Sequence, residues 1–153
     1  MVTKTKIKIN DNQELRNKID ELYEKTEQVY LAKWACSMFK RILKKVNIDY
    51  TSIDEFVNGY KVNEEWQNGK VRMYDVRQVG FSANRIARDC KDKVKQAAMR
   101  AVVQSIGTGH MREHAMVTSD YSIKVINLLF PNDIGKVTKE RKWQLLELKQ
   151  LIN

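Results

Sequence analysis

The chain has 153 residues, of which 42% are hydrophobic and one is proline, so it is long enough for one domain with a buried core. No apolar run is long enough to cross a bilayer, and the N-terminus lacks the pattern of a secretory signal, which predicts a cytoplasmic protein. The formal net charge of +9 favours anionic partners, and two cysteines are too few for a disulfide framework.

The N-terminal part of the chain is expected to lead from an irregular segment into helices. Residues 1–10 alternate Thr, Lys and Ile without a hairpin partner, which predicts a flexible basic arm. Residues 11–153 are expected to form a single helical domain. Apolar residues at intervals of three and four predict helices around 15–23 and 27–46, with Asp11 or Asn12 as the first cap.

Two further helices are expected before residue 90. Ser52 and Glu55 have the spacing of a capping box and predict a helix start. The next helix begins near Arg72, and its apolar pattern includes Tyr74.

A central helix is expected after residue 92. Asp92 caps a segment that is small and apolar around most of its circumference, as expected for the middle of a bundle. Continued to Phe130, this helix would exceed roughly 50 Å, whereas a domain of this size is about 40 Å across. A break is therefore expected at Gly107–Gly109. The following helix should carry both histidines and stop before Pro131, and Thr138 should open the last one. Together these elements predict an all-α, single-domain bundle of about seven helices.

Both histidines of the chain, His110 and His114, lie four residues apart, directly after the glycine pair. With Glu113 they match H-x-x-E-H, the inverted zinc-protease pattern in which two histidines bind metal and the glutamate activates water. A five-residue string is too short to be specific. The pair is therefore a weak metal candidate, which Asp120 or a cysteine would have to complete.

Two other interpretations of the histidine pair stay open. In the first, the imidazoles are packed at a helix crossing and hydrogen-bonded to carbonyls or hydroxyls. In the second, they line a small polar pocket or partner surface with side chains at helical spacing, namely Thr108, Tyr121 and Lys124. The chain has no nucleophile with a partnered base and no phosphate-binding glycine motif, so we expect no catalytic residue and no cofactor.

Basic residues are concentrated in residues 33–45 and 85–100. The residues expected to form a basic contact surface are Lys40, Arg41, Lys44, Arg85, Arg88 and Lys95. The positive electrostatic potential of these residues favours binding to an acidic protein surface or to a nucleic acid. A solvated lysine-rich surface without a partner gives the same sequence pattern.

From about Leu31 to Val125 the sequence resembles a family of small, all-helical bacterial immunity proteins. The motifs that carry the resemblance are Leu31-Ala32-Lys33-Trp34-Ala35, Thr108-x-His110, His114-Ala115 and Tyr121-x-x-Lys124. The family usually has histidine where this chain has Gln104. Asp120 replaces a small residue of the family and is expected to pair with Lys124 one helical turn on.

The resemblance implies a non-enzymatic protein that neutralises a toxin by stoichiometric binding, with Thr108, His110, His114, Tyr121 and Lys124 as its signature cluster. The charge adds the expectation of an acidic toxin surface. One alternative is a nucleic-acid-binding domain that uses residues 85–100 on phosphates. A less favoured one is a metal- or small-ligand-binding protein centred on His110 and His114. The sequence leaves the oligomeric state open, with a homodimer as one option.

Overall fold

Seven α-helices account for most of residues 2–153, the part of the chain that the computed structural model describes, and this part contains no strand. The all-α bundle expected from the sequence is therefore confirmed. No helix in these residues combines the length and apolar character needed to span a membrane. The helices are α1 (Gln13–Glu24), α2 (Gln28–Lys45), α3 (Asp54–Gln67), α4 (Met73–Asp89), α5 (Lys93–Gly107), α6 (His114–Leu129) and α7 (Ile134–Ile152), with a 3-10 turn, η1 (Tyr50–Ser52), before α3.

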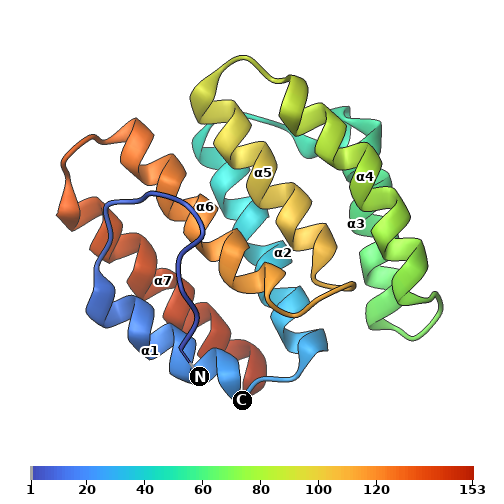
Figure 1. Ribbon diagram of the computed structural model, residues 1–153, viewed down its shortest axis with the longest axis horizontal. Coiled ribbons are helices and arrows are strands. Elements are labelled where there is room, and N and C mark those ends of the chain that lie inside the picture. Colours follow the sequence, from blue (N-terminus) through green and yellow to red (C-terminus); the bar gives the residue numbers. More distant parts are fainter. Residues whose placement is uncertain (1) are drawn as a thin grey trace.

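Three helices form the middle of the bundle. α2, α5 and α6 pack against one another, with α3 and α4 on one side and α1 and α7 on the other (Figure 1). α5 contacts α2, α3, α4 and α6, as its small apolar residues predicted. Two apolar clusters fill the spaces between these layers. One lies toward α3 and α4, and the other surrounds Trp34 toward α1 and α7.

Two of the predicted helix caps and the predicted break are confirmed. The Asn12 side chain accepts a hydrogen bond from the backbone N–H of Leu15, and Asp92 accepts one from the N–H of Lys95. The helix after Asp92 ends at Gly107, and α6 begins seven residues later.

Three expectations about helix starts and faces are wrong. Ser52 does not cap α3, because its hydroxyl donates to the carbonyl of Asp49 within η1. Thr138 lies inside α7, which begins after Asp133, whose carboxylate accepts from the N–H of Lys136. Asp133 thus takes the capping role at α7, whereas Asp49 caps η1 and α3 starts after Ile53 without a side-chain cap. Tyr74 belongs to the exposed side of α4 and not to its apolar side.

A buried ionic network joins α1, α6 and α7. The Asp120 carboxylate on α6 accepts hydrogen bonds from Arg16 on α1, at 2.9 and 3.0 Å, and from Arg141 on α7, at 2.8 Å. The expected pairing of Asp120 with Lys124 is therefore wrong. Lys124 instead donates from Nζ to the backbone carbonyl of Lys8, at 3.2 Å. The two arginines outcompete Lys124 because they reach the carboxylate inside the core, where a planar guanidinium can donate two bonds.

Residues 2–10 contain no regular secondary structure and run across α6 and α1. The N–H of Thr3 donates to Asp20 at 2.6 Å, and the N–H of Asn10 donates to the side-chain oxygen of Asn127 at 2.7 Å. These contacts place the segment on the bundle, and its flexibility stays a prediction.

Candidate functional site

The two histidines lie where the chain turns from α5 into α6. His114 is the first residue of α6, and His110 belongs to the turn before it, so the expectation that one helix carries both is wrong. The N–H groups of His110 and Met111 both donate to the carbonyl of Gly107, at 2.9 Å, which closes the turn. The ring centroids of the two histidines are 6.0 Å apart.

Hydrogen bonds to residues of α2 and α3 and to the end of α1 hold this turn in place. The hydroxyl of Thr108 is fully buried and accepts a hydrogen bond from the Asn63 amide on α3, at 3.2 Å. The Gln28 amide on α2 donates to the Thr108 carbonyl at 2.7 Å. Arg112, in the turn itself, donates to the carbonyl of Tyr23 in the last turn of α1, at 2.7 Å, and to that of Thr26 just after α1, at 2.8 Å. Thr108 therefore anchors the turn, and the imidazoles are carried by a fixed backbone.

Glycines at positions 107 and 109 allow the turn to pack closely. A Cβ at Gly107 would lie 2.9 Å from Cδ2 of His114. A Cβ at Gly109 would lie 2.9 Å from Val76 on α4 and 3.2 Å from Trp66 on α3. The absence of these two side chains brings the His114 ring onto α5 and the turn onto α3 and α4.

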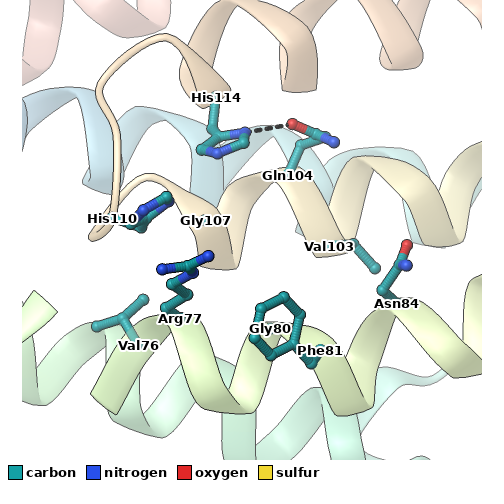
Figure 2. A pocket seen from close by; sticks show the side chains of 10 residues that line it. All are labelled: Val76, Arg77, Gly80, Phe81, Asn84, Val103, Gln104, Gly107, His110 and His114. Atoms are coloured by element: carbon teal, nitrogen blue, oxygen red, sulfur yellow. Dashed lines mark hydrogen bonds between the residues drawn. The ribbon is translucent and has the colours of Figure 1, made fainter. Parts of the chain in front are cut away.

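A pocket of about 370 Å³ lies between α4 and the end of α5 with its turn (Figure 2). The apolar part of its lining includes Val76 and Phe81 of α4 and Val103 of α5. The polar side chains around it are Arg77 and Asn84 from α4, Gln104 from α5, and His110 and His114. Figure 2 shows the Arg77 side chain extending from α4 toward the segment that carries His110. A concave site with apolar walls and a few convergent polar groups is typical of a binding site.

The protonation of His114 is set by its neighbours. Its Nδ1 lies 2.6 Å from Oε1 of Gln104 on α5. Because an amide oxygen only accepts, Nδ1 carries the proton of the neutral ring. Burial lowers the pKa of His114, and the nearby charges of His110 and Lys6 lower it further, whereas Glu113 acts in the opposite direction. Burial and the neighbouring cations therefore both favour the neutral form of the His114 ring.

We expect an NMR titration of the imidazole resonances to give His114 a pKa below the ordinary value of 6.5. Since the folded state disfavours the proton, the unfolded state binds more protons as the pH falls below about 6.5. The free energy of unfolding should therefore rise with pH up to about 6.5 and then level off. His114→Asn should remove this part of the pH dependence. A His114 pKa above 6.5 would contradict the prediction.

The structure separates the five residues of the signature cluster. His110 and His114 line the pocket, and Thr108 lies buried beneath the turn. Tyr121 and Lys124 lie farther along α6 and do not line the pocket. Tyr121 packs against the larger apolar cluster, and Lys124 holds the N-terminal segment.

The six residues of the expected basic surface lie on three helices. Lys40 on α2 donates to the Tyr60 hydroxyl at 2.5 Å, and burial raises the pKa of Tyr60 to about 12. Arg41 pairs with Glu140 at 2.9 Å and stacks on the Trp143 ring. These two cations therefore have internal partners. The other four are exposed, with Lys44 on α2, Arg85 and Arg88 on α4, and Lys95 on α5. A contact role for the six stays a prediction.

Within residues 2–153, no group of three His, Cys, Asp or Glu side chains is placed to hold a metal ion. Asp120, considered as a third ligand beside His110 and His114, is instead held by Arg16 and Arg141. The H-x-x-E-H string thus contributes two imidazoles to a pocket wall, and Glu113 is exposed.

Four polar or aromatic pocket residues were missed as site residues by the sequence reasoning, namely Arg77, Phe81, Asn84 and Gln104. Arg77 and Phe81 lie one turn apart on α4, and the guanidinium carbon of Arg77 is 5.6 Å from the centre of the Phe81 ring. The i, i+4 spacing of an arginine and an aromatic residue was a usable signal. The sequence singled out Gln104 only through the family resemblance, because its contact with His114 forms only where the turn brings α5 and α6 together.

A model of the family described as Imm-5 like putative immunity protein matches residues 21–151, which include the turn, the pocket and all seven helices except the first part of α1 and the last residue of α7. No curated protein and no solved structure matches the chain. The chain therefore belongs to the Imm-5 like immunity protein family.

Proposed function

We propose that this protein protects a bacterial cell by binding a toxin domain stoichiometrically in the cytoplasm and covering its active site or another essential surface. Family membership supports an immunity role and suggests a non-enzymatic one. Binding alone is sufficient for such protection, and no turnover is required.

The observation that carries the proposal further is the composition of the exposed side of α4. Of the nine arginines in the chain, the four that are exposed among the described residues all lie on α4 or at its N-cap, at positions 72, 77, 85 and 88. Tyr74 and Phe81, each 56% exposed, are on the same helix. Arginine and aromatic residues are the types enriched in protein interfaces and among the side chains that dominate binding energy. We call the side chains of Tyr74, Arg77, Phe81, Arg85 and Arg88 the α4 face.

Charge supports an acidic partner for the α4 face. Arg77 and Arg85 form no ion pair with any residue of the described chain, and the whole chain carries a formal charge of +9. Unpaired cations at an exposed interface steer association with a surface of opposite charge. The rate of association with the toxin is therefore expected to fall as ionic strength rises.

The size of the α4 face is suitable for the centre of a protein interface. A helix of 17 residues is about 25 Å long, and standard interfaces bury about 800 Å² on each partner. The pocket of about 370 Å³ adjoins the same helix, so a partner side chain can enter the molecule beside the α4 face.

The test is co-expression with the toxin encoded beside the gene, with survival and complex formation measured in the same strains. We expect rescue together with a 1:1 complex that survives size-exclusion chromatography. Rescue without a complex would contradict neutralisation by binding. Purified protein should also be titrated with a fluorescent single-stranded 20-mer. Tight binding with a steep log-linear salt dependence, without any toxin complex, would favour a nucleic-acid-binding role instead.

A further inference from the structure

We propose that the pocket between α4 and the α5–α6 turn receives a carboxylate, supplied by a glutamate side chain of the toxin. This inference rests on the proposed function, and it adds the chemical group that the pocket recognises. Three features of this pocket support a bound carboxylate. They are a cation without a counter-ion, free hydrogen-bond donors and an apolar wall.

The first observation is a positive charge without a counter-ion. Arg77 lines the pocket, and within the described residues its guanidinium contacts the Phe81 ring but forms no ion pair or hydrogen bond. His110 lines the same pocket and has no hydrogen bond to another side chain of the described residues. Lys6 adds positive potential near His114, and the acidic group that acts on that ring, Glu113, is exposed to solvent. The site therefore favours a bound anion.

The second observation is a set of amide donors. The oxygen of the Gln104 amide is used by His114, which leaves the Gln104 nitrogen free to donate. Asn84 also lines the pocket, and its side chain has no hydrogen-bond partner among the described residues. A guanidinium can donate two parallel bonds to a carboxylate, and neutral amides can complete its shell.

The third observation concerns the shape and the apolar wall. A volume of about 370 Å³ is larger than a carboxylate needs, so the ligand also brings a stem. Val76, Phe81 and Val103 offer apolar surface to the methylene groups of a glutamate. Among the described residues, Arg77 is the one arginine or lysine of the pocket lining, and a single guanidinium matches the single charge of a carboxylate better than the two charges of a phosphate. The occupant that fits best is therefore glutamate.

The experiment has two parts, and the first needs no toxin. Purified protein labelled with nitrogen-15 is titrated with N-acetyl-glutamate amide and, as the matched neutral probe, N-acetyl-glutamine amide. We expect the glutamate probe to shift the ring resonances of His110 and His114 and the side-chain amide of Gln104. The glutamine probe should bind at least about tenfold more weakly.

Three variants locate the effect within the protein. Arg77→Gln should weaken binding of the glutamate probe about tenfold or more, whereas Arg85→Gln, on the same helix but outside the pocket, should leave it unchanged. Gly80→Leu should block the site, because Gly80 lines the pocket and a Cβ there meets no atom within 4 Å. All three positions are on the surface side of α4, and the dispersed amide spectrum of each variant checks that it is folded.

The second part uses the toxin complex. Arg77→Gln and Gly80→Leu should each weaken the complex about tenfold or more. Equal shifts with both probes, or stronger shifts of the same resonances with inorganic phosphate, would overturn the carboxylate assignment. A toxin complex that forms but is insensitive to both variants would also overturn it and leave the proposed function intact. If the glutamate probe binds and no toxin complex forms, the proposed function fails, and with it the assignment of the carboxylate to a toxin.

Discussion

Replacing Asp120 with alanine is expected to lower the free energy of unfolding by about 3–5 kcal/mol. The Asp120 side chain is almost completely buried and accepts hydrogen bonds from both Arg16 and Arg141. Without its carboxylate, two guanidiniums stay in the core with less compensation, and an uncompensated buried charge is far more costly than the loss of an exposed pair. Because this network joins α1 and α7 to α6, its loss should weaken the packing of α1 and α7 on the middle of the bundle.

The measurement is urea unfolding followed by far-ultraviolet circular dichroism. Asp120→Asn, which keeps the shape and removes the charge, separates the charge from the cavity. The matched control is Asp89→Ala, because Asp89 is exposed and pairs with exposed Arg88 at 3.3 Å. That pair should contribute no more than about 1 kcal/mol. Similar losses for Asp120→Ala and Asp89→Ala would show that the network does not support the fold as described.

The second large effect is expected at the α4 face. Phe81→Ala should weaken the toxin complex by about 2 kcal/mol or more, which corresponds to roughly 30-fold in Kd. Phe81 is 56% exposed in the free protein, so its removal should change the free energy of unfolding by no more than about 0.5 kcal/mol. The side chain is thus expected to matter for binding and not for folding.

The chain offers a close control for this prediction. Leu146 on α7 is 55% exposed, and α7 lies on the opposite side of the bundle from α4 (Figure 1). Leu146→Ala removes a similar apolar surface and should leave Kd unchanged. Both variants should be measured by isothermal titration calorimetry against the purified toxin domain. If Leu146→Ala weakens the complex and Phe81→Ala does not, the contact face lies on α7 and not on α4.

The outcome for α4 also shows how far a sequence pattern can be trusted. The helix itself was predicted from its apolar spacing, yet Tyr74 was placed on the wrong side. Val76, Ala83 and Ala87 form its buried line, and the aromatic residues alternate with arginines on the exposed line. Both lines have helical periodicity. A pattern based on apolar character alone therefore cannot distinguish a core stripe from an exposed stripe that includes aromatic residues.

The candidate site also shows where prediction from sequence periodicity fails. The pairing of His110 with His114 and their proximity to a glycine turn were visible in the sequence, and the structure places both rings on one pocket. Their role in a signature with Tyr121 and Lys124 assumed one continuous helical face. The turn at residues 108–113 breaks that face, so the pocket is completed by α4 and not by the later turns of α6.

The sequence by itself determined the helices, the central position of α5, the break at Gly107–Gly109 and the caps at Asp92 and at one of the pair Asp11 and Asn12. These features depend on interactions between residues a few positions apart, which periodicity and capping chemistry describe well. Only the tertiary structure decided the partners of Asp120, the anchoring of Thr108 by Gln28 and Asn63, and the meeting of Arg77 with the histidine turn. Those contacts join residues far apart in the chain, so they depend on how the helices pack and not on any local spacing.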